Sequence, residues 1–103
     1  MAIVEYVYPL GEGARKRHSH ETRRGKVVTF VVQLEVELRG VWVPVVRYDM
    51  AHRRAHVDLY ETPTRKIKRF LDLSPAEVMT LADEDIKQNW EWYQQEFLRR
   101  NER

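Results

Sequence analysis

The sequence predicts an α+β fold in which one long C-terminal helix packs on one face of an antiparallel sheet of four or five strands. Residues 26–70 contain runs of β-branched and aromatic residues separated by turn residues, which is typical of antiparallel strands. Residues 75–100 instead repeat apolar side chains at helical spacing. With 103 residues, the chain has the length of a single domain spanning residues 1–103.

The composition excludes several classes of protein. The chain has no cysteine, which excludes a disulfide framework and thiolate metal sites and fits a reducing compartment. Its longest apolar run, residues 41–46, contains Pro44 and is far shorter than the ~20 residues that a membrane-spanning helix needs. No signal peptide is recognisable. We therefore expect a cytoplasmic protein without membrane contact.

Charge is unevenly distributed along the chain. The net charge of +2 is too small to indicate a nucleic-acid partner by itself. Residues 11–26 and 47–69 are rich in basic side chains, whereas residues 71–103 carry eight acidic and four basic ones. This distribution predicts a basic side made by strands and loops and an acidic helix, although mixed charge also serves solubility alone.

The N-terminal part predicts one strand and a loop. Residues 3–8 are β-branched and aromatic and end at Pro9. Residues 11–26 are mostly polar, so we expect a mobile basic loop there. Within it, His18 and His20 could share one side of an extended backbone as a metal pair would. Because no third ligand is near, an exposed polar loop is the default interpretation.

The clearest strand covers residues 26–39, in which apolar and mixed side chains alternate with the period of a half-buried strand. Gly40 predicts a turn, and a loop of three residues there would keep Trp42, Val46 and Tyr48 on the core face.

The opposite face of these strands carries more apolar side chains than a solvated sheet should. The valines concerned are Val27, Val31, Val41, Val43 and Val45. Apolar residues on both faces of an antiparallel sheet indicate that something covers the second face. We expect a second copy of the chain, and therefore a homodimer.

The C-terminal part predicts an edge strand and then the helix. Residues 65–70 resume an extended pattern with four basic side chains, which is typical of an edge protected from unwanted pairing. Ser74 can cap a helix, Pro75 is favoured at its first position and Glu77 completes a capping box. The helical stripe that follows consists of Met79, Ala82, Ile86, Trp90, Tyr93 and Phe97.

The stretch with the most chemical content is a predicted hairpin at residues 45–60, with its connection at about residues 50–55. If Asp49 faces His56, antiparallel pairing sets Arg47 opposite Asp58, and all four side chains point to one face.

Three interpretations of this polar cluster, to which His52 in the connection also belongs, remain open. The first is cross-strand electrostatics with no further role. The second is metal-independent cleavage of RNA, in which Asp49 orients His56, His52 is the second acid or base and Arg47 stabilises charge. The third is a metal site formed by His52, His56 and Asp58. For RNA, the backbone phosphates would be held by Arg53, Arg54, Arg65, Lys66 and Lys68.

A family resemblance rests on short motifs. They are WVPVVRYD at residues 42–49, Ala51-His52, HVD at residues 56–58 and ADEDIKQNW at residues 82–90. Over residues 40–98 the chain resembles a family of small uncharacterised prokaryotic proteins whose central element is similar to the core of TumE-type toxins. Two features depart from that pattern. Arg53 and Arg54 stand where a glycine-containing turn is expected, and the turn at residues 62–64 lacks glycine.

The resemblance implies a toxin-like RNase that is neutralised by an antitoxin protein. The second interpretation of the polar cluster adds that RNA would be cleaved without a metal or another cofactor. The alternative is a non-catalytic module that binds nucleic acid or a protein, in which the polar cluster is structural.

Overall fold

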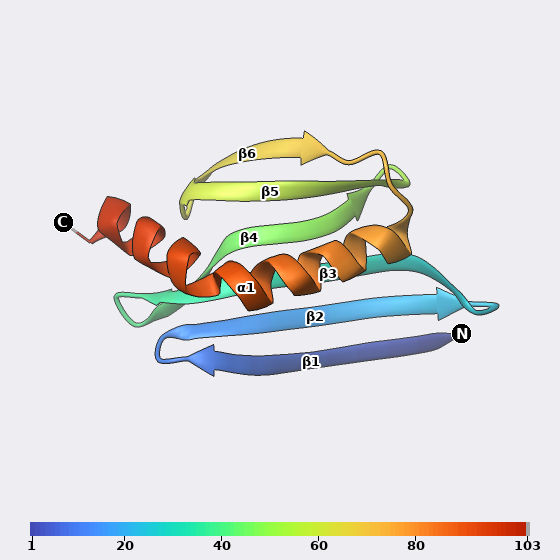
Figure 1. Cartoon of the computed structure of the whole chain (residues 1–103), viewed down its shortest axis with the longest axis horizontal. Coiled ribbons are helices and arrows are strands. Elements are labelled where there is room, and N and C mark those ends of the chain that lie inside the picture. Colours follow the sequence, from blue (N-terminus) through green and yellow to red (C-terminus); the bar gives the residue numbers. More distant parts are fainter. Residues whose placement is uncertain (103) are drawn as a thin grey trace.

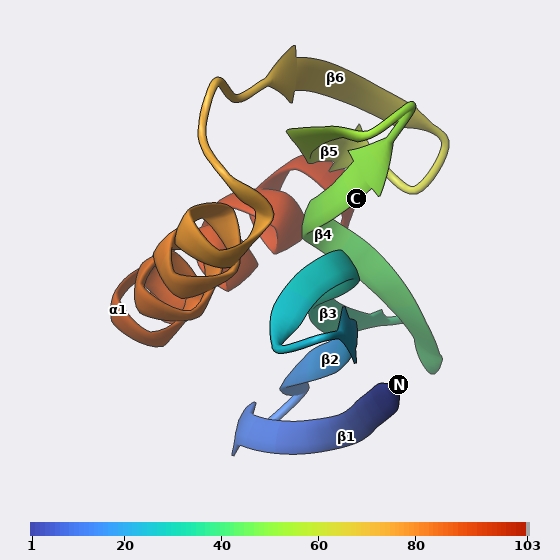
Figure 2. The same cartoon turned by 90° about the vertical axis from the view of Figure 1, so that its right-hand side faces the viewer.

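The structure, a computed structural model, describes residues 1–102 as one six-stranded antiparallel sheet and one helix (Figure 1). The strands are β1 (Ala2–Gly11), β2 (Ala14–Arg23), β3 (Lys26–Leu38), β4 (Val41–Ala51), β5 (Arg54–Thr62) and β6 (Arg65–Phe70). They lie in the sheet in chain order, and α1 (Pro75–Asn101) crosses one face (Figure 2). The α+β class and the C-terminal helix are confirmed, but the sheet has six strands instead of four or five.

The additional strand is β2, and the mobile loop predicted for residues 11–26 is therefore wrong. β2 pairs with β1 on one side and β3 on the other. Its side chains are almost all polar, and they are satisfied by neighbours in place of solvent: Arg15 and Arg17 contact Glu35, and Lys16 contacts Asp83. A strand of this kind has no apolar alternation, so the sequence pattern could not reveal it.

A β-bulge in β4 decides which side chains face the helix. Leu34 pairs with Val46 and Glu35 with Pro44, so Val45 is an extra residue in β4. Upstream of this bulge the faces are exchanged relative to the predicted ones. Trp42 therefore pairs with Glu37 on the face away from the helix, and its predicted core position is wrong.

The same bulge weakens the basis of the predicted homodimer. Val45 is buried in the core under the helix, and Val43 packs against that core. The face away from α1 is therefore much less apolar than the uninterrupted alternation suggested, and the homodimer loses the observation on which it was predicted.

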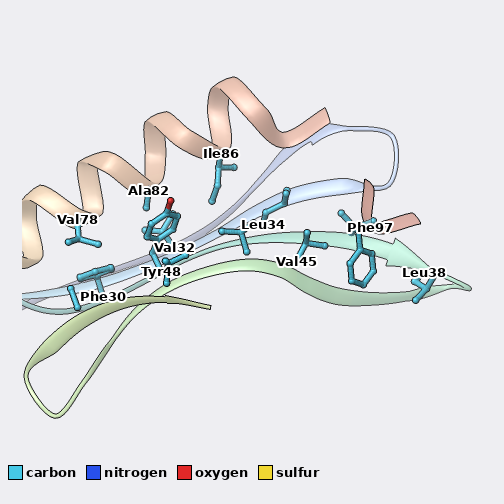
Figure 3. Close-up of a cluster of buried hydrophobic side chains, with 14 residues drawn as sticks. Phe30, Val32, Leu34, Leu38, Val45, Tyr48, Val78, Ala82, Ile86 and Phe97 are labelled. Atoms are coloured by element: carbon cyan, nitrogen blue, oxygen red, sulfur yellow. The ribbon is translucent and has the colours of Figure 1, made fainter. Parts of the chain in front are cut away.

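The hydrophobic core lies between α1 and the sheet (Figure 3). α1 begins with the predicted capping box, in which Glu77 N donates to the Ser74 hydroxyl and Ser74 N to the Glu77 carboxylate. Its fully buried side chains are Val78, Ala82, Ile86 and Phe97, and β3 and β4 supply most of the partners. Within residues 1–102, no helix has the length and apolar character needed to cross a membrane.

A polar contact ties α1 to the sheet beside this core. The Tyr48 hydroxyl donates to Asp85 Oδ2 at 2.7 Å, and the Tyr93 hydroxyl donates to the same oxygen at 2.8 Å. Burial, and then the hydrogen bond and charge of Asp85, raise the pKa of both tyrosines. Both phenols therefore remain donors at neutral pH and hold β4 against the helix.

The packing of α1 predicts a strong difference between two aliphatic positions. Ile86 is fully buried, so Ile86→Ala should lower the free energy of unfolding by about 2 to 5 kcal/mol because it leaves a cavity. Leu81 is 41% exposed on the same helix. Leu81→Ala should therefore change the free energy of unfolding by less than about 1 kcal/mol. Urea denaturation followed by circular dichroism measures both values, and equal losses would contradict this packing.

Candidate functional site

The predicted hairpin register is confirmed on the side of the sheet away from α1, which we call the helix-free face. Asp49 pairs with His56, and Arg47 pairs with Asp58. Because Tyr48 of β4 lies in the core beneath the helix, the alternation of β-strands turns the residues on either side of it to the helix-free face. The polar cluster is therefore formed by adjacent strands and is not covered by the helix.

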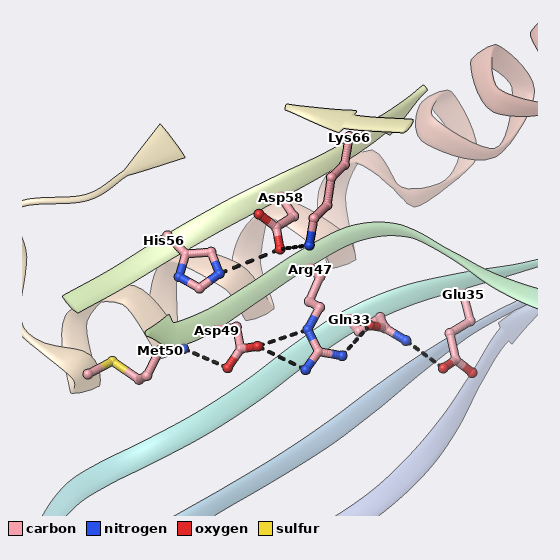
Figure 4. Close-up of polar contacts among 8 residues, drawn as sticks. All are labelled: Gln33, Glu35, Arg47, Asp49, Met50, His56, Asp58 and Lys66. Atoms are coloured by element: carbon pink, nitrogen blue, oxygen red, sulfur yellow. Dashed lines mark hydrogen bonds and ion pairs between the residues drawn. The ribbon is translucent and has the colours of Figure 1, made fainter. Parts of the chain in front are cut away.

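Arg47 and Asp49 form the best-defined contact of this cluster (Figure 4). Arg47 Nε donates to Asp49 Oδ2 at 2.9 Å, and Arg47 Nη2 forms an ion pair with the same oxygen at 2.8 Å. Met50 N donates to Asp49 Oδ1 at 2.6 Å. Arg47 Nη1 also donates to Gln33 Oε1 at 3.1 Å. The arginine thus links β4 to β3 and leaves its carboxylate partner well satisfied.

His56 and Asp58 lie deeper, each with 2% of its surface exposed. The His56 Nε2 to Asp58 Oδ2 distance is 3.5 Å, and Lys66 Nζ donates to the same oxygen at 3.2 Å. That hydrogen bond is the main cause of the raised pKa of Lys66. His56 Nδ1 and Asp58 Oδ1 are buried without a hydrogen-bond partner among the described residues. Buried polar atoms usually have a hydrogen-bond partner. These two atoms are therefore free to form hydrogen bonds with a ligand or with water.

The structure corrects two catalytic roles predicted for the cluster. Asp49 does not orient His56, since Arg47 and the Met50 amide occupy its oxygens, and the carboxylate beside the imidazole is Asp58. His52 lies in a two-residue turn with Arg53, where both residues have positive φ, and its side chain is exposed. The turn is shorter than predicted, so His52 lies at the exposed end of the hairpin and does not cover the polar cluster.

The cluster continues across β3 to β2, which the sequence did not reveal. Glu35 accepts hydrogen bonds from Arg15 Nε at 2.7 Å, Arg17 Nε at 2.9 Å and Gln33 Nε2 at 2.6 Å. Burial alone would raise the pKa of Glu35, but these donors outweigh it and hold the pKa below its ordinary value. The polar surface therefore spans the five strands β2 to β6.

Aromatic side chains on the helix-free face lie under cations. The Arg15 guanidinium is 4.2 Å from the centre of the Trp42 ring, and the Arg54 guanidinium is 4.2 Å from that of Phe70. Lys68 Nζ is 6.0 Å from the same Phe70 ring. The sequence analysis missed Arg15 because β2 was not recognised, and Trp42 because the bulge in β4 was not recognised. It also missed Phe70, which pairs with His56 between β5 and β6.

The predicted phosphate-binding residues are only partly brought together. Lys66 and Lys68 pair with Tyr60 and Asp58, and Lys68 and Arg54 flank Phe70 on the helix-free face. Arg53 lies in the exposed turn, and Arg65 begins β6 beyond a bulge.

The described part of the chain has no group of three or more His, Asp or Glu side chains arranged to hold a metal ion. His18 and His20 do share one side of β2, but His18 Nε2 and His20 Nδ1 are 2.7 Å apart and bond to each other. Burial lowers the pKa of His18, which favours the neutral form of the His18 ring. Neither the pair nor His52, His56 and Asp58 form a metal site here.

Comparison with known proteins gives a family without an activity. The model of a domain of unknown function, DUF7718, matches residues 1–103. The chain belongs to the DUF7718 family. No curated protein and no solved structure matches the chain. The function of this DUF7718 protein therefore has to be inferred from the helix-free face.

The low pKa of Glu35 predicts a pH-dependent stability difference. Because the folded protein holds this pKa below the ordinary 4.5, Glu35 stabilises the fold above that value, and its contribution is lost as the pH falls through the folded pKa. Glu35→Gln should therefore lower the free energy of unfolding at pH 7 by about 1 to 3 kcal/mol. In urea denaturation below pH 4.5, the difference in the free energy of unfolding between Glu35→Gln and wild type should be smaller than at pH 7.

The matched control is Glu37→Gln, because Glu37 lies two residues along the same strand and is exposed. The free energy of unfolding of Glu37→Gln should equal that of wild type both at pH 7 and below pH 4.5. A Glu35→Gln deficit that persists unchanged at low pH would contradict the role assigned to the Glu35 carboxylate.

Proposed function

We propose that this DUF7718 protein acts on RNA by binding a single strand across the helix-free face. The observation that carries the proposal is that acidic side chains on that face are largely buried and their basic partners are more exposed. Three of the carboxylates on that face lie beneath the cations that pair with them, and these cations are more exposed than their partners. The carboxylates are Glu35, Asp49 and Asp58, and the cations that pair with them are Arg15, Arg17, Arg47 and Lys66. Arg54 and Lys68 lie at the Phe70 ring on the same face.

The exposed fractions support this arrangement. The Glu35 and Asp58 side chains are 9% and 2% exposed, whereas their partners Arg17 and Lys66 are 46% and 43% exposed. A ligand that approaches these pairs therefore meets their guanidinium and ammonium groups before their carboxylates. Such a surface attracts phosphates and gives salt-dependent binding.

The aromatic rings favour a single strand over a duplex. Trp42 and Phe70 lie among these cations, and Phe70 is 42% exposed. Unpaired bases stack on aromatic side chains displayed by a sheet, whereas the bases of a duplex are already stacked. The resemblance of residues 40–98 to TumE-type toxins favours RNA as the nucleic acid and an antitoxin as the protein partner.

Metal-independent cleavage of the bound RNA is a second candidate, favoured by the unpartnered atoms of the His56–Asp58 pair. In this mechanism His56 accepts the proton of a 2′ hydroxyl, and the 2′ oxygen attacks the adjacent phosphorus to form a 2′,3′-cyclic phosphate. The bond from phosphorus to the 5′ oxygen breaks, and the 5′ oxygen takes a proton from water. Asp58 stabilises the imidazolium, and Arg47 stabilises charge on the phosphate. His56 is only 2% exposed, so Phe70, whose ring is 5.8 Å from the imidazole, must move aside.

The binding proposal is tested by two neighbouring residues of β6. Lys68 lies on the helix-free face, and Arg69 pairs with Val57 on the other face. In fluorescence anisotropy with a labelled single-stranded RNA, Lys68→Ala should weaken binding and reduce the slope of log Kd against log salt concentration by about 1. Arg69→Ala removes the same charge and should leave the slope unchanged. If the two variants changed the slope equally, or if wild type did not bind RNA, the helix-free face would be excluded as the RNA-binding surface.

Cleavage is tested with the two histidines of the hairpin. In buffer containing EDTA, His56→Gln should reduce cleavage of labelled RNA by a factor of about 100 or more while RNA binding is retained. His52→Gln, in the exposed turn, should cleave at the wild-type rate. If wild type binds RNA but leaves it intact, the cleavage mechanism is excluded and the binding proposal remains.

A further inference from the structure

The two edges of the sheet differ sharply in chemistry. β6 forms one edge, and four of its six residues are basic. β1 forms the other edge over ten residues, in which Glu5 is the only charged side chain. Edge strands carry unpaired backbone N–H and C=O groups, and proteins usually protect them with charge. β6 has that protection and β1 does not.

The side chains of β1 are apolar and exposed on both faces of the sheet. On the helix side, Tyr6 is 42% and Tyr8 58% exposed, and on the helix-free side Ile3 is 58% and Val7 44% exposed. The helix packs mainly on β3 to β5, and its Trp90 ring lies against Gly11 at the end of β1, whereas the four side chains named above remain exposed. A long, apolar and uncovered edge is a site for pairing with another strand.

A groove beside β1 adds a second, independent feature. It has a volume of about 540 Å³ and lies between the edge strand and the first half of α1. β1 lines it with Tyr6, Tyr8 and Leu10, and α1 with Asp83 and Lys87. In strand addition, backbone hydrogen bonds supply affinity while pockets receive alternate side chains of the added strand. The groove is placed to receive such side chains on the helix side.

We propose that the added strand is β1 of a second copy, paired antiparallel about a twofold axis perpendicular to the sheet. Three edge-to-edge arrangements of two copies exist. Pairing β6 with β6 opposes two basic strands and is repelled. Pairing β1 with β6 leaves a free edge at each end and does not close. Pairing β1 with β1 is closed and brings two apolar edges together.

Charge also restricts the register of this pairing. A twofold axis at Glu5 would set two carboxylates opposite each other. An axis at Tyr6 instead sets Glu5 opposite Val7 of the second copy and Val4 opposite Tyr8 of the second copy. The tyrosines of each copy then lie at the groove of the other. Both helices lie on the same side of the joined sheet, so the two helix-free faces also form one surface.

The test measures the mass of the protein in solution and does not depend on RNA binding. Val7→Glu places a carboxylate opposite Arg17 of its own chain, which the monomer tolerates, but opposite Glu5 in the dimer. Tyr8→Glu similarly faces Lys16 of its own chain. Ile67→Glu is the control, because Ile67 is 56% exposed on the opposite edge strand. Circular dichroism establishes that each variant is folded.

Light scattering coupled to size-exclusion chromatography should show a dimer for wild type and Ile67→Glu. Both β1 variants should be monomers, because the substitution should raise the dissociation constant of the dimer at least tenfold. A monomeric wild type, a species larger than a dimer, or folded β1 variants that remain dimeric would overturn the proposal. RNA binding by a monomeric wild type would overturn the dimer and leave the proposed function intact.

Discussion

The register between β4 and β5 is the constraint on which the site depends. A slip of one residue would turn Arg47, Asp49, His56 and Asp58 from the helix-free face into the core, where their charges would be desolvated. The two-residue turn at His52-Arg53 fixes this register. Both residues have positive φ, which suits the twist of a hairpin although neither is glycine. The backbone cost of this turn is therefore offset by the pairing that it sets.

The polar cluster itself explains how a sheet can bury carboxylates without a covering layer. Glu35 lies under two arginines and Gln33, and Asp58 lies under Lys66. The aliphatic parts of such long side chains cover the buried groups while their charged ends remain in solvent. The arrangement stabilises one face of the sheet and, as a consequence, places the charged ends of these arginines and of Lys66 at its surface. Packing and the proposed binding surface thus arise from the same contacts.

Sequence patterns predicted the parts of this fold that depend on simple alternation. The β4–β5 register followed from the spacing of Asp49 and His56, and the helix followed from its cap and apolar stripe. Two features are not encoded in alternation. β2 is stabilised by polar contacts with Glu35 and Asp83, which are distant in the sequence, and the bulge at Val45 exchanges the faces upstream. Both errors affected the site, because Arg15 and Trp42 were assigned elsewhere.

The chain contains three tryptophans, and their positions allow the central claim to be tested directly. Trp42 lies beneath Arg15 on the helix-free face, whereas Trp92 is 59% exposed on α1. In nuclear magnetic resonance titrations with a single-stranded RNA, the indole N–H resonance of Trp42 should shift with saturation and that of Trp92 should stay in place. A shift of Trp92 with an unchanged Trp42 would show that RNA binds elsewhere and would contradict the helix-free face as the binding surface.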